Sequence, residues 1–556
     1  MRPSISTIFH VLNKKLILAF FIAVQLINVL NAQTKSIVLG RPTNNSITAS
    51  VLFNQNVNFY FVYGTTSGVY TNTTSVYNNT ANTPDEIDFI NLNANTQYYY
   101  QLKYKLSSAS VYSTTPEYSF HTQRADGEEF RFTIEADEHL YDKKGVASIY
   151  KICLANQLKD KPDFMLSLGD IFGDDHNPYS ITSYELDTLH RYYRSYLANI
   201  CHSVPFYVCL GNHEGENDYY MGQNPPNNLA IWGTQWRKFY YPNPFPNSFY
   251  SGNTDNENFG IGNPENYYSW TWGNSLFVVL DVYRDQCDSS GKPQGWNWSL
   301  GLPQYTWLKT TLESSTSKFK FVFAHHIRGQ GRGGITNAKL YEWGGYQNAT
   351  LSSFTFPIHR PGWAKPIHQL FVDNGVNVFF QGHDHVFAHE QLDGVTYQAV
   401  PMPSDSTYEI GMLANADAYI SDTLDGTGHI RVTVNQSCVK VDYIRAYLPA
   451  DTIGGLHHNQ EVAFSYTIGN CGPAGITTIT ENDLIKVYPN PANNKLSIHF
   501  PDAAKDVKIK VLNAFGQIVI QTSNTELDIN SIANGVYFVN IESEKYHVNK
   551  KIIIQH

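Results

Sequence analysis

The chain has 556 residues, of which 42% are hydrophobic and only 16% are charged, and its formal net charge is −10. This length suggests roughly three or four domains, and the apolar content is sufficient for packed cores. An acidic chain with so few charges lacks the basic field that nucleic-acid phosphates require, so we expect no nucleic-acid partner.

Residues 1–32 have the pattern of a secretory signal peptide. Lys14 and Lys15 precede the apolar run Leu16–Leu30, and Ala32 offers a small residue for cleavage. The alternative is a permanent membrane anchor, but the run is shorter than the roughly 20 residues needed to span a bilayer. No other stretch is long and apolar enough to cross a membrane. We therefore expect a secreted or surface-attached protein without a transmembrane segment after cleavage.

Export permits disulfides. The six cysteines allow fifteen pairings, among which the sequence cannot choose. They are Cys153, Cys201, Cys209, Cys287, Cys438 and Cys471.

Residues 34–123 show short alternating strands separated by turn residues, which predicts a β-sandwich. Ser46–Phe53 and Phe59–Tyr63 are the clearest of these strands. The segment Leu92–Tyr98 resembles the corner of a fibronectin type III domain, in which an aromatic hydroxyl bonds back to the backbone. We expect this domain to serve as a scaffold.

Residues 128–467 contain five apolar runs, each of which ends in a polar motif. Segments with helical periodicity separate several of them, which indicates an α/β domain. In open α/β folds the carboxyl ends of the strands carry the ligand site. The run–motif pairs are Phe130–Ala136 with Asp137-Glu138-His139, Phe164–Leu168 with Gly169-Asp170, Pro205–Leu210 with Gly211-Asn212-His213-Glu214, Phe319–Ala324 with His325-His326, and Val376–Gln381 with Gly382-His383-Asp384-His385.

The residue types in these motifs suit a pair of adjacent metal ions. A carboxylate such as Asp170 can give one oxygen to each cation, while neutral imidazoles and an amide complete the shells. Two cations about 3.5–4 Å apart clamp a phosphoryl group and convert bound water to hydroxide. Each motif alone is weak evidence, because Gly-Asn-His-Glu is also a common polar turn. Five in order are difficult to obtain by chance.

The ordered set resembles the calcineurin-like metallophosphoesterases, and within them the purple acid phosphatase branch, over about Phe130–Tyr447. The segment Tyr267–Asp281 is similar to a hairpin of those enzymes. The resemblance implies two metal ions (Fe, Mn or Zn) and His213 as proton donor to the leaving group. It implies that one metal is held by Asp137, His139, Asp170 and His385, and the other by Asp170, Asn212, His325 and His383.

One position departs from the purple enzymes. These have a tyrosine three residues after the bridging aspartate, where this chain has Gly173, and here His139 is present instead. The purple colour is therefore not expected, and the identity of the metals is open.

Other polar residues near the motifs have weaker assignments. His326 and Arg328 are candidates for substrate contact, with packing as the alternative for His326. Glu214 is expected to stabilise a turn or orient His213. The run 174–176 (Asp-Asp-His) resembles a further metal cluster, although such loop residues are usually solvated. The segments 215–266 and 328–360 lack regular periodicity, and we interpret the first as a wall over the metal pocket.

The last part of the chain forms a separate unit at 483–556, after a linker at 468–482. The segments Ile485–Pro491, Lys508–Gly516, Gly535–Val539 and Lys550–Ile554 alternate as strands of a small sandwich. Together they resemble the C-terminal sorting domain of the type IX secretion system of Bacteroidetes-type Gram-negative bacteria. The alternative is a small binding module.

We therefore expect a multidomain chain: an α/β metallophosphoesterase sandwich flanked by an N-terminal β-sandwich and a small C-terminal β-sandwich. The expected function is that of a secreted phosphomonoesterase, in which metal-bound hydroxide attacks a small phosphate ester. Two alternatives remain open. One is a phosphodiesterase or nucleotidase on the same site, and the other is a surface glycan-binding protein or adhesin with an inert metal site.

Overall fold

The computed structural model describes residues 35–173, 175–285, 293–327, 332–471, 485–500, 507–513, 516–543 and 547–556. The predicted signal peptide, most of the predicted linker and Arg328 lie outside the described residues. The chain divides into two compact units, with the boundary between Asn470 and Cys471. Within the described residues, no helix has both the length and the apolar character needed to cross a bilayer.

The first unit begins with two small antiparallel sheets whose apolar faces pack on each other. Phe61 and Phe89, one from each sheet, have ring centroids 5.0 Å apart. At the predicted corner, the backbone N–H of Asn93 donates to the Tyr98 hydroxyl at 2.8 Å. The strands are β1 (Lys35–Gly40), β2 (Ile47–Phe53), β3 (Val57–Gly64), β4 (Asn72–Thr73), β5 (Tyr77–Asn79), β6 (Asp85–Phe89), β7 (Gln97–Leu106), β8 (Ser113–Thr114) and β9 (Tyr118–His121).

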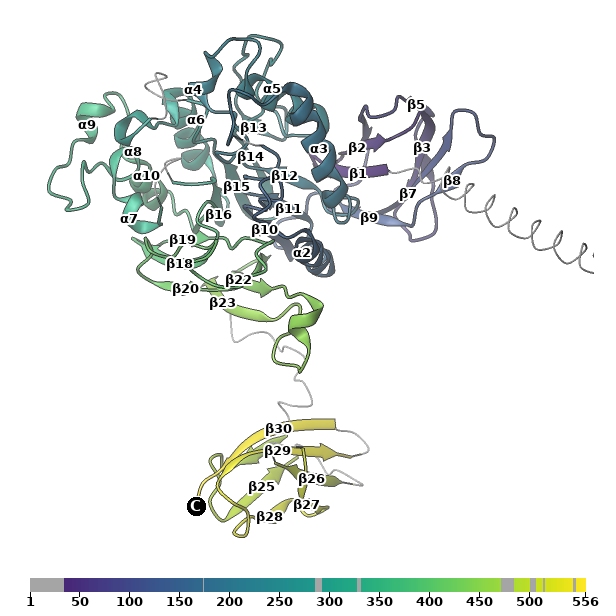
Figure 1. Ribbon diagram of the computed structural model, residues 1–556, viewed down its shortest axis with the longest axis vertical. Helices are drawn as coiled ribbons and strands as arrows, with labels where there is room; N and C mark the ends of the chain where they lie inside the picture. Colours follow the sequence, from purple (N-terminus) through teal and green to yellow (C-terminus); the bar gives the residue numbers. More distant parts are fainter. Residues whose placement is uncertain are drawn as a thin grey trace, which may run out of the picture. The chain divides into compact units, whose positions relative to one another are not determined.

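Two larger sheets follow in the same unit (Figure 1). The six-stranded sheet has the order β12-β11-β10-β21-β22-β23, and the eight-stranded sheet has the order β13-β14-β15-β16-β17-β19-β18-β20. The first comprises β10 (Phe130–Glu135), β11 (Phe164–Ser167), β12 (Phe206–Val208), β21 (Gly428–Val434), β22 (Cys438–Arg445) and β23 (Val462–Gly469). The second comprises β13 (Ser251–Gly252), β14 (Tyr268–Trp272), β15 (Ser275–Val279), β16 (Phe319–Phe323), β17 (Val378–Gln381), β18 (Phe387–Leu392), β19 (Val395–Ala399) and β20 (Asp422–Leu424).

The two sheets pack face to face around an aromatic core. The ring of Phe132 on β10 lies 5.1 Å from Phe277 on β15 and 5.4 Å from Phe321 on β16. Helices α2 and α3 cover the outer face of the first sheet, and α6 and α10 cover that of the second. The result is a four-layer α/β/β/α sandwich, which confirms the expected fold class. The helices are α2 (Ala147–Lys159), α3 (Ser183–Leu197), α4 (Asp218–Met221), α5 (Leu229–Tyr240), η1 (Gly295–Asn297), α6 (Gly301–Ser314), α7 (Ile335–Ala338), α8 (Tyr341–Gly344), α9 (Phe356–His359), α10 (Ile367–Asp373) and η2 (Pro449–Thr452).

The five expected strands are β10, β11, β12, β16 and β17. Strands β10, β11 and β12 are mutually parallel, as are β15, β16, β17 and β19. Their carboxyl ends therefore lie at one edge of each sheet, directly before the polar motifs. Strands β14 and β15 form the expected antiparallel hairpin.

The segment 215–266 is more regular than its sequence indicated, because it contains α5. The Asn228 side chain caps this helix by accepting the backbone N–H of Ile231 at 2.9 Å. The buried Arg237 side chain pairs with Glu216 at 2.6 Å, which fixes the helix to the preceding loop. Two buried positions of this helix are occupied by Arg237 and Gly233 instead of by apolar side chains. They interrupt the apolar periodicity, and the helix was therefore not predicted.

The second unit is a small β-sandwich with its own apolar core. One sheet has the order β24-β25-β28 and the other β27-β26-β29-β30. Its strands are β24 (Lys486–Tyr488), β25 (Lys495–His499), β26 (Lys508–Leu512), β27 (Ile518–Thr522), β28 (Glu526–Asp528), β29 (Gly535–Glu542) and β30 (His547–Ile554). Among the cysteines that the structure describes, Cys153, Cys201 and Cys209 are free and buried, whereas Cys438 and Cys471 are disulfide-bonded.

Candidate metal centre

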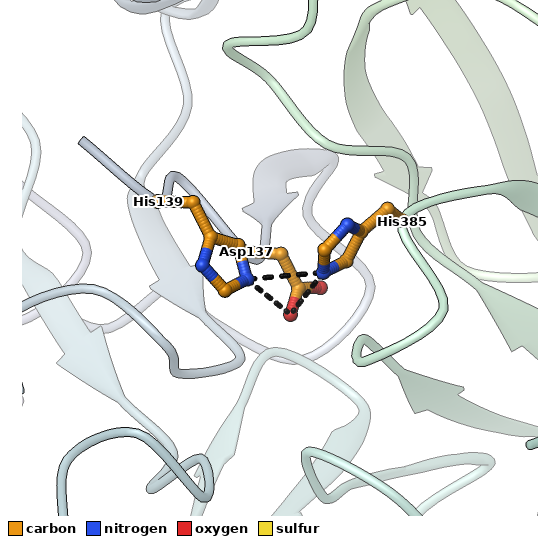
Figure 2. Close-up of side chains that lie close together, drawn as sticks. All are labelled: Asp137, His139 and His385. Atoms are coloured by element: carbon orange, nitrogen blue, oxygen red, sulfur yellow. Dashed lines mark hydrogen bonds and ion pairs between the residues drawn. The ribbon is translucent and has the colours of Figure 1, made fainter. Parts of the chain in front are cut away.

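The first group of predicted ligands gathers Asp137, which follows β10, with His139 and His385. Figure 2 shows one ring nitrogen of each histidine turned toward the Asp137 carboxylate. The Asp137 Oδ1 atom lies 3.6 Å from His385 Nε2 and 3.9 Å from His139 Nε2. The two Nε2 atoms are 3.0 Å apart. One ligand atom from each residue lies close enough to the others for a single cation to contact all three.

The second group gathers around Asp170, at the end of β11. The Asp170 Oδ2 atom lies 3.2 Å from His325 Nε2, and His383 Nδ1 lies 3.3 Å from the same His325 nitrogen. The other nearby imidazoles are His213 at 3.8 Å and His139 at 3.9 Å from Asp170 Oδ2. Asp170 thus stands between the two groups, as a bridging carboxylate must.

Asn212 is the remaining predicted ligand. It lies between Gly211 and His213, and the backbone of both of these residues approaches the Asp170 carboxylate. The N–H of His213 donates to Asp170 Oδ1 at 2.8 Å. A Cβ at Gly211 would lie 2.3 Å from the same oxygen, so only glycine permits this approach. The structure therefore brings six of the predicted ligands together and places Asn212 between two residues that contact Asp170, while their roles as ligands remain predictions.

The backbone at these positions is unusual. Non-glycine residues seldom adopt φ > 0, and a residue held there costs of order 1–3 kcal/mol. Such strain persists where the surroundings fix the side chain for a function. Five of the predicted ligands have it: Asp137 (φ 64°), His139 (44°), Asp170 (60°), His383 (72°) and His385 (60°).

The buried donor atoms fit a cation site. Asp137 Oδ1 and Asn212 Oδ1 are buried without a hydrogen-bond partner, which is costly unless another electrophile contacts them. A donor set of two carboxylates, one amide and four imidazoles suits Zn, Mn or Fe. The residues present therefore fit two such cations.

The electrostatics of the cluster leave the Asp137 carboxylate poorly compensated and keep two of the predicted histidine ligands neutral. Burial raises the pKa of Asp137 to about 8. Burial opposes a charge on Asp170 as well, but His325 and His213 lower its pKa well below the usual value. Burial and neighbouring imidazoles lower the pKa of His383 and His385, which keeps both rings neutral, the form that binds metal.

Groups behind the ligands fix their orientation. The Nδ1–H of His325 donates to the Leu168 carbonyl at 2.8 Å, leaving Nε2 for a cation. The Tyr141 hydroxyl lies 2.9 Å from His139 Nδ1 on the ring side away from the cluster. Sequence reasoning missed Tyr141, whose only signal is its place two residues after His139.

His213 is not one of the predicted ligands, although its Nε2 atom lies near Asp170 and His139, and it has a carboxylate partner of its own. Its Nδ1 atom lies 2.5 Å from Asp175 Oδ1, so its Nε2 atom is the one directed toward Asp170. Burial disfavours the charged ring, but Asp170 and Asp175 together raise the pKa of His213 to about 9. In the sequence, Asp175 belongs to a run that resembles a further metal cluster but is usually solvated, and nothing in its spacing indicates His213 as its partner.

Three further candidates have definite positions. Gly173 packs against the next motif, because a Cβ there would lie 1.9 Å from the His213 carbonyl oxygen, so no tyrosine fits at that position. His326 is fully buried, with its ring 4.9 Å from that of His383. Asp384 accepts the N–H of Gly333 at 2.9 Å, which ties the histidine turn to the loop that follows His325.

Two regions of the chain match known protein families. Residues 130–387 match the calcineurin-like phosphoesterases, and residues 486–555 match the secretion system C-terminal sorting domain. No curated protein matches the chain. Among solved structures it is similar to PhoD, with a TM-score of 0.54 and 17% identity over 78% of this chain and 90% of that one. It is also similar to purple acid phosphatase PPD1 from yellow lupin (Lupinus luteus) seeds, with a TM-score of 0.51 and 15% identity over 79% of this chain and 74% of that one.

The fold and the clustered histidines and aspartates of this region define a metallophosphoesterase domain. More specifically, the chain contains a calcineurin-like phosphoesterase domain followed by a type IX secretion sorting domain, as the sequence motifs predicted. The sorting domain indicates export to the exterior or the cell surface of a Bacteroidetes-type bacterium.

Proposed function

We propose that this protein is a secreted phosphomonoesterase that works with two metal ions. The observation that carries the proposal is the position of Asp170. Its Oδ2 atom lies within 3.9 Å of His325, His213 and His139, which come from the ends of three different strands. A carboxylate surrounded in this way can be shared between two cations and still face the imidazole of His213.

We assign the two cations to the ligand sets that the family resemblance implies. Asp137, His139, Asp170 and His385 would hold one, and Asp170, Asn212, His325 and His383 the other. When bound, the cations would neutralise phosphate charge and lower the pKa of water at the site. The buried ligand residues would in turn hold the phosphoryl group at one place and exclude bulk water from it.

His213 is positioned to deliver a proton to the leaving group. Asp175 accepts the Nδ1–H of the ring, so the Nε2–H is free to be donated. A pKa of about 9 keeps the ring protonated at neutral pH, although cations on Asp170 would offset part of that rise. A departing alkoxide is a strong base, and a proton donor within reach typically contributes about 10²–10⁴ in rate.

The proposal is tested with a matched substrate pair. The purified protein, stripped by a chelator and reloaded with Fe, Mn or Zn, is assayed on p-nitrophenyl phosphate and on bis-p-nitrophenyl phosphate. A faster rate on the monoester supports the proposal, and a faster rate on the diester supports a phosphodiesterase. No hydrolysis with any metal would leave the glycan-binding alternative, against which the strained ligand backbone argues.

The remaining parts of the chain are proposed to serve export and scaffolding. We assign residues 1–32 as a cleaved signal peptide and 34–123 as a fibronectin type III-like scaffold, with the catalytic domain beginning at residue 128. Strand β23 continues to Gly469, so we place the end of the catalytic unit after Asn470 and the sorting domain at 483–556.

A further inference from the structure

A second group of metal-binding side chains lies beside the dinuclear centre, at the loop that follows β11. Asp175, His176 and His213 each offer one ligand atom, and these atoms lie within 4.8 Å of one another. The rings of His176 and His213 are stacked, with centroids 4.9 Å apart and an angle of 11° between their planes. The half-buried Asp142 carboxylate lies at the edge of the group, 4.0 Å from His176 Nε2.

We propose that Asp175, His176 and His213 form a third cation site that binds Zn²⁺, and that its occupancy slows hydrolysis. Two imidazoles and one carboxylate are the donor set of many zinc sites that keep an open fourth position. Mg²⁺ and Ca²⁺ prefer sites made only of oxygen ligands, so the site discriminates against them.

The site differs from the dinuclear centre in its access to solvent. The side chain of His176 is 40% exposed and those of His213 and Asp175 are 18% and 17% exposed, whereas His325 and Asp137 are fully buried. A cation at this exposed site can therefore exchange with the medium while the two buried cations stay in place.

The consequence for the reaction rests on the proposed function, in which His213 donates a proton. A nitrogen that binds Zn²⁺ must first release its proton to solvent. The ring then carries one proton fewer and no longer acts as an imidazolium acid. Loss of a general acid lowers the rate by about 10²–10⁴-fold.

The binding is tested by equilibrium dialysis of the full-length, metal-loaded protein against micromolar Zn²⁺, with all metals counted in the same sample. We expect one extra zinc per chain in the wild type and none in His176→Ala, with both resident cations retained in each. His457→Ala is the matched control, because His457 is 49% exposed and also lies near a carboxylate, that of Glu461 at 3.9 Å. Equal zinc uptake by the wild type and His176→Ala would overturn the site.

The effect on rate is measured on the same samples with an alkyl phosphate, whose leaving group needs a proton. Zinc should slow the wild type and His457→Ala about 10²-fold and leave His176→Ala at its zinc-free rate. Zinc bound at the third site without inhibition would overturn the inhibitory role. A metal-loaded wild type that hydrolyses no phosphoester before zinc is added would contradict the proposed function instead, and the dialysis result would still decide the site.

Discussion

The Glu214 carboxylate is buried beneath the backbone turn that carries Asp170 and accepts the Asp170 N–H at 2.9 Å. The same side chain accepts the N–H groups of Ile171 and Gly211 at 2.7 and 2.6 Å. One carboxylate therefore holds together the turns after β11 and β12, from which Asp170, Asn212 and His213 project. Its role is the turn-stabilising one that the sequence indicated.

Replacing Glu214 by Ala should lower the free energy of unfolding of the first unit by about 2–4 kcal/mol, because several buried N–H groups lose their acceptor. Metal content should fall with it, since the turns that carry the ligands loosen. Chemical denaturation with metal analysis of the purified variant measures both. Glu313→Ala, on the exposed face of α6, is the control and should change neither. A Glu214→Ala variant as stable and as metal-rich as the wild type would contradict this role.

Adding a methyl group at Gly173 should disturb the catalytic turn. The new Cβ would meet the His213 carbonyl oxygen and the Glu214 Cα atom, at 1.9 and 2.1 Å. We expect Gly173→Ala to melt several degrees below the wild type and to lose most of its activity. Gly222→Ala is the matched control, since a Cβ there meets nothing within 4 Å. Equal melting temperatures for the two variants would contradict this prediction, because they would mean that the turn can accommodate a Cβ at Gly173.

Replacing His213 by Ala should reduce kcat on an alkyl phosphate by about 10²–10⁴-fold. The loss on p-nitrophenyl phosphate should be smaller, because p-nitrophenolate leaves readily without a proton. His389→Ala, on β18, serves as the control and should retain activity on both substrates. If His213→Ala loses the same factor on both substrates, His213 is not the proton donor.

The charge of Asp175 should appear in the pH profile. Asp175 raises the pKa of His213, and the proton donor is lost when pH rises through that pKa. Asp175→Asn removes this stabilisation, so the basic limb of kcat/KM should move to lower pH while the acidic limb stays. A profile that only decreases in height would indicate a purely structural role for Asp175.

How far the site could be predicted depended on where each residue lies relative to a strand. Asp137, Asp170 and His325 directly follow apolar runs, and the ends of parallel strands share one edge of a sheet, so the sequence alone predicts that these residues lie together. Tyr141 and Asp175 lie in loops whose paths are set by tertiary packing, and no sequence spacing indicates their partners. For the same reason the capped helix α5 was missed, since its buried charge pair between Arg237 and Glu216 hides its periodicity.

Stability should also depend on pH through His190, away from the metal centre. Burial, followed by Arg237 and Arg194, lowers the pKa of His190 to about 3. Above pH 6.5 the ring is neutral in both folded and unfolded chains. As pH falls below 6.5 the unfolded chain binds a proton that the folded chain does not, so stability should fall by up to about 1.4 kcal/mol per pH unit.

His190→Phe removes this titration and keeps an aromatic ring beside Phe172, whose centroid lies 4.6 Å away. The unfolding free energy of the variant should therefore fall less steeply than that of the wild type between pH 6.5 and 5. Denaturation curves of both proteins across this range supply the comparison. If the unfolding free energies of the two proteins decrease equally between pH 6.5 and 5, His190 is protonated in the folded protein.

Whether Asp170 is shared by two cations is tested most directly by an anomalous-scattering crystal structure of the metal-loaded protein. We expect two peaks about 3.5–4 Å apart, each within coordination distance of one Asp170 oxygen. A single peak, or a pair of peaks of which only one contacts Asp170, would contradict this expectation.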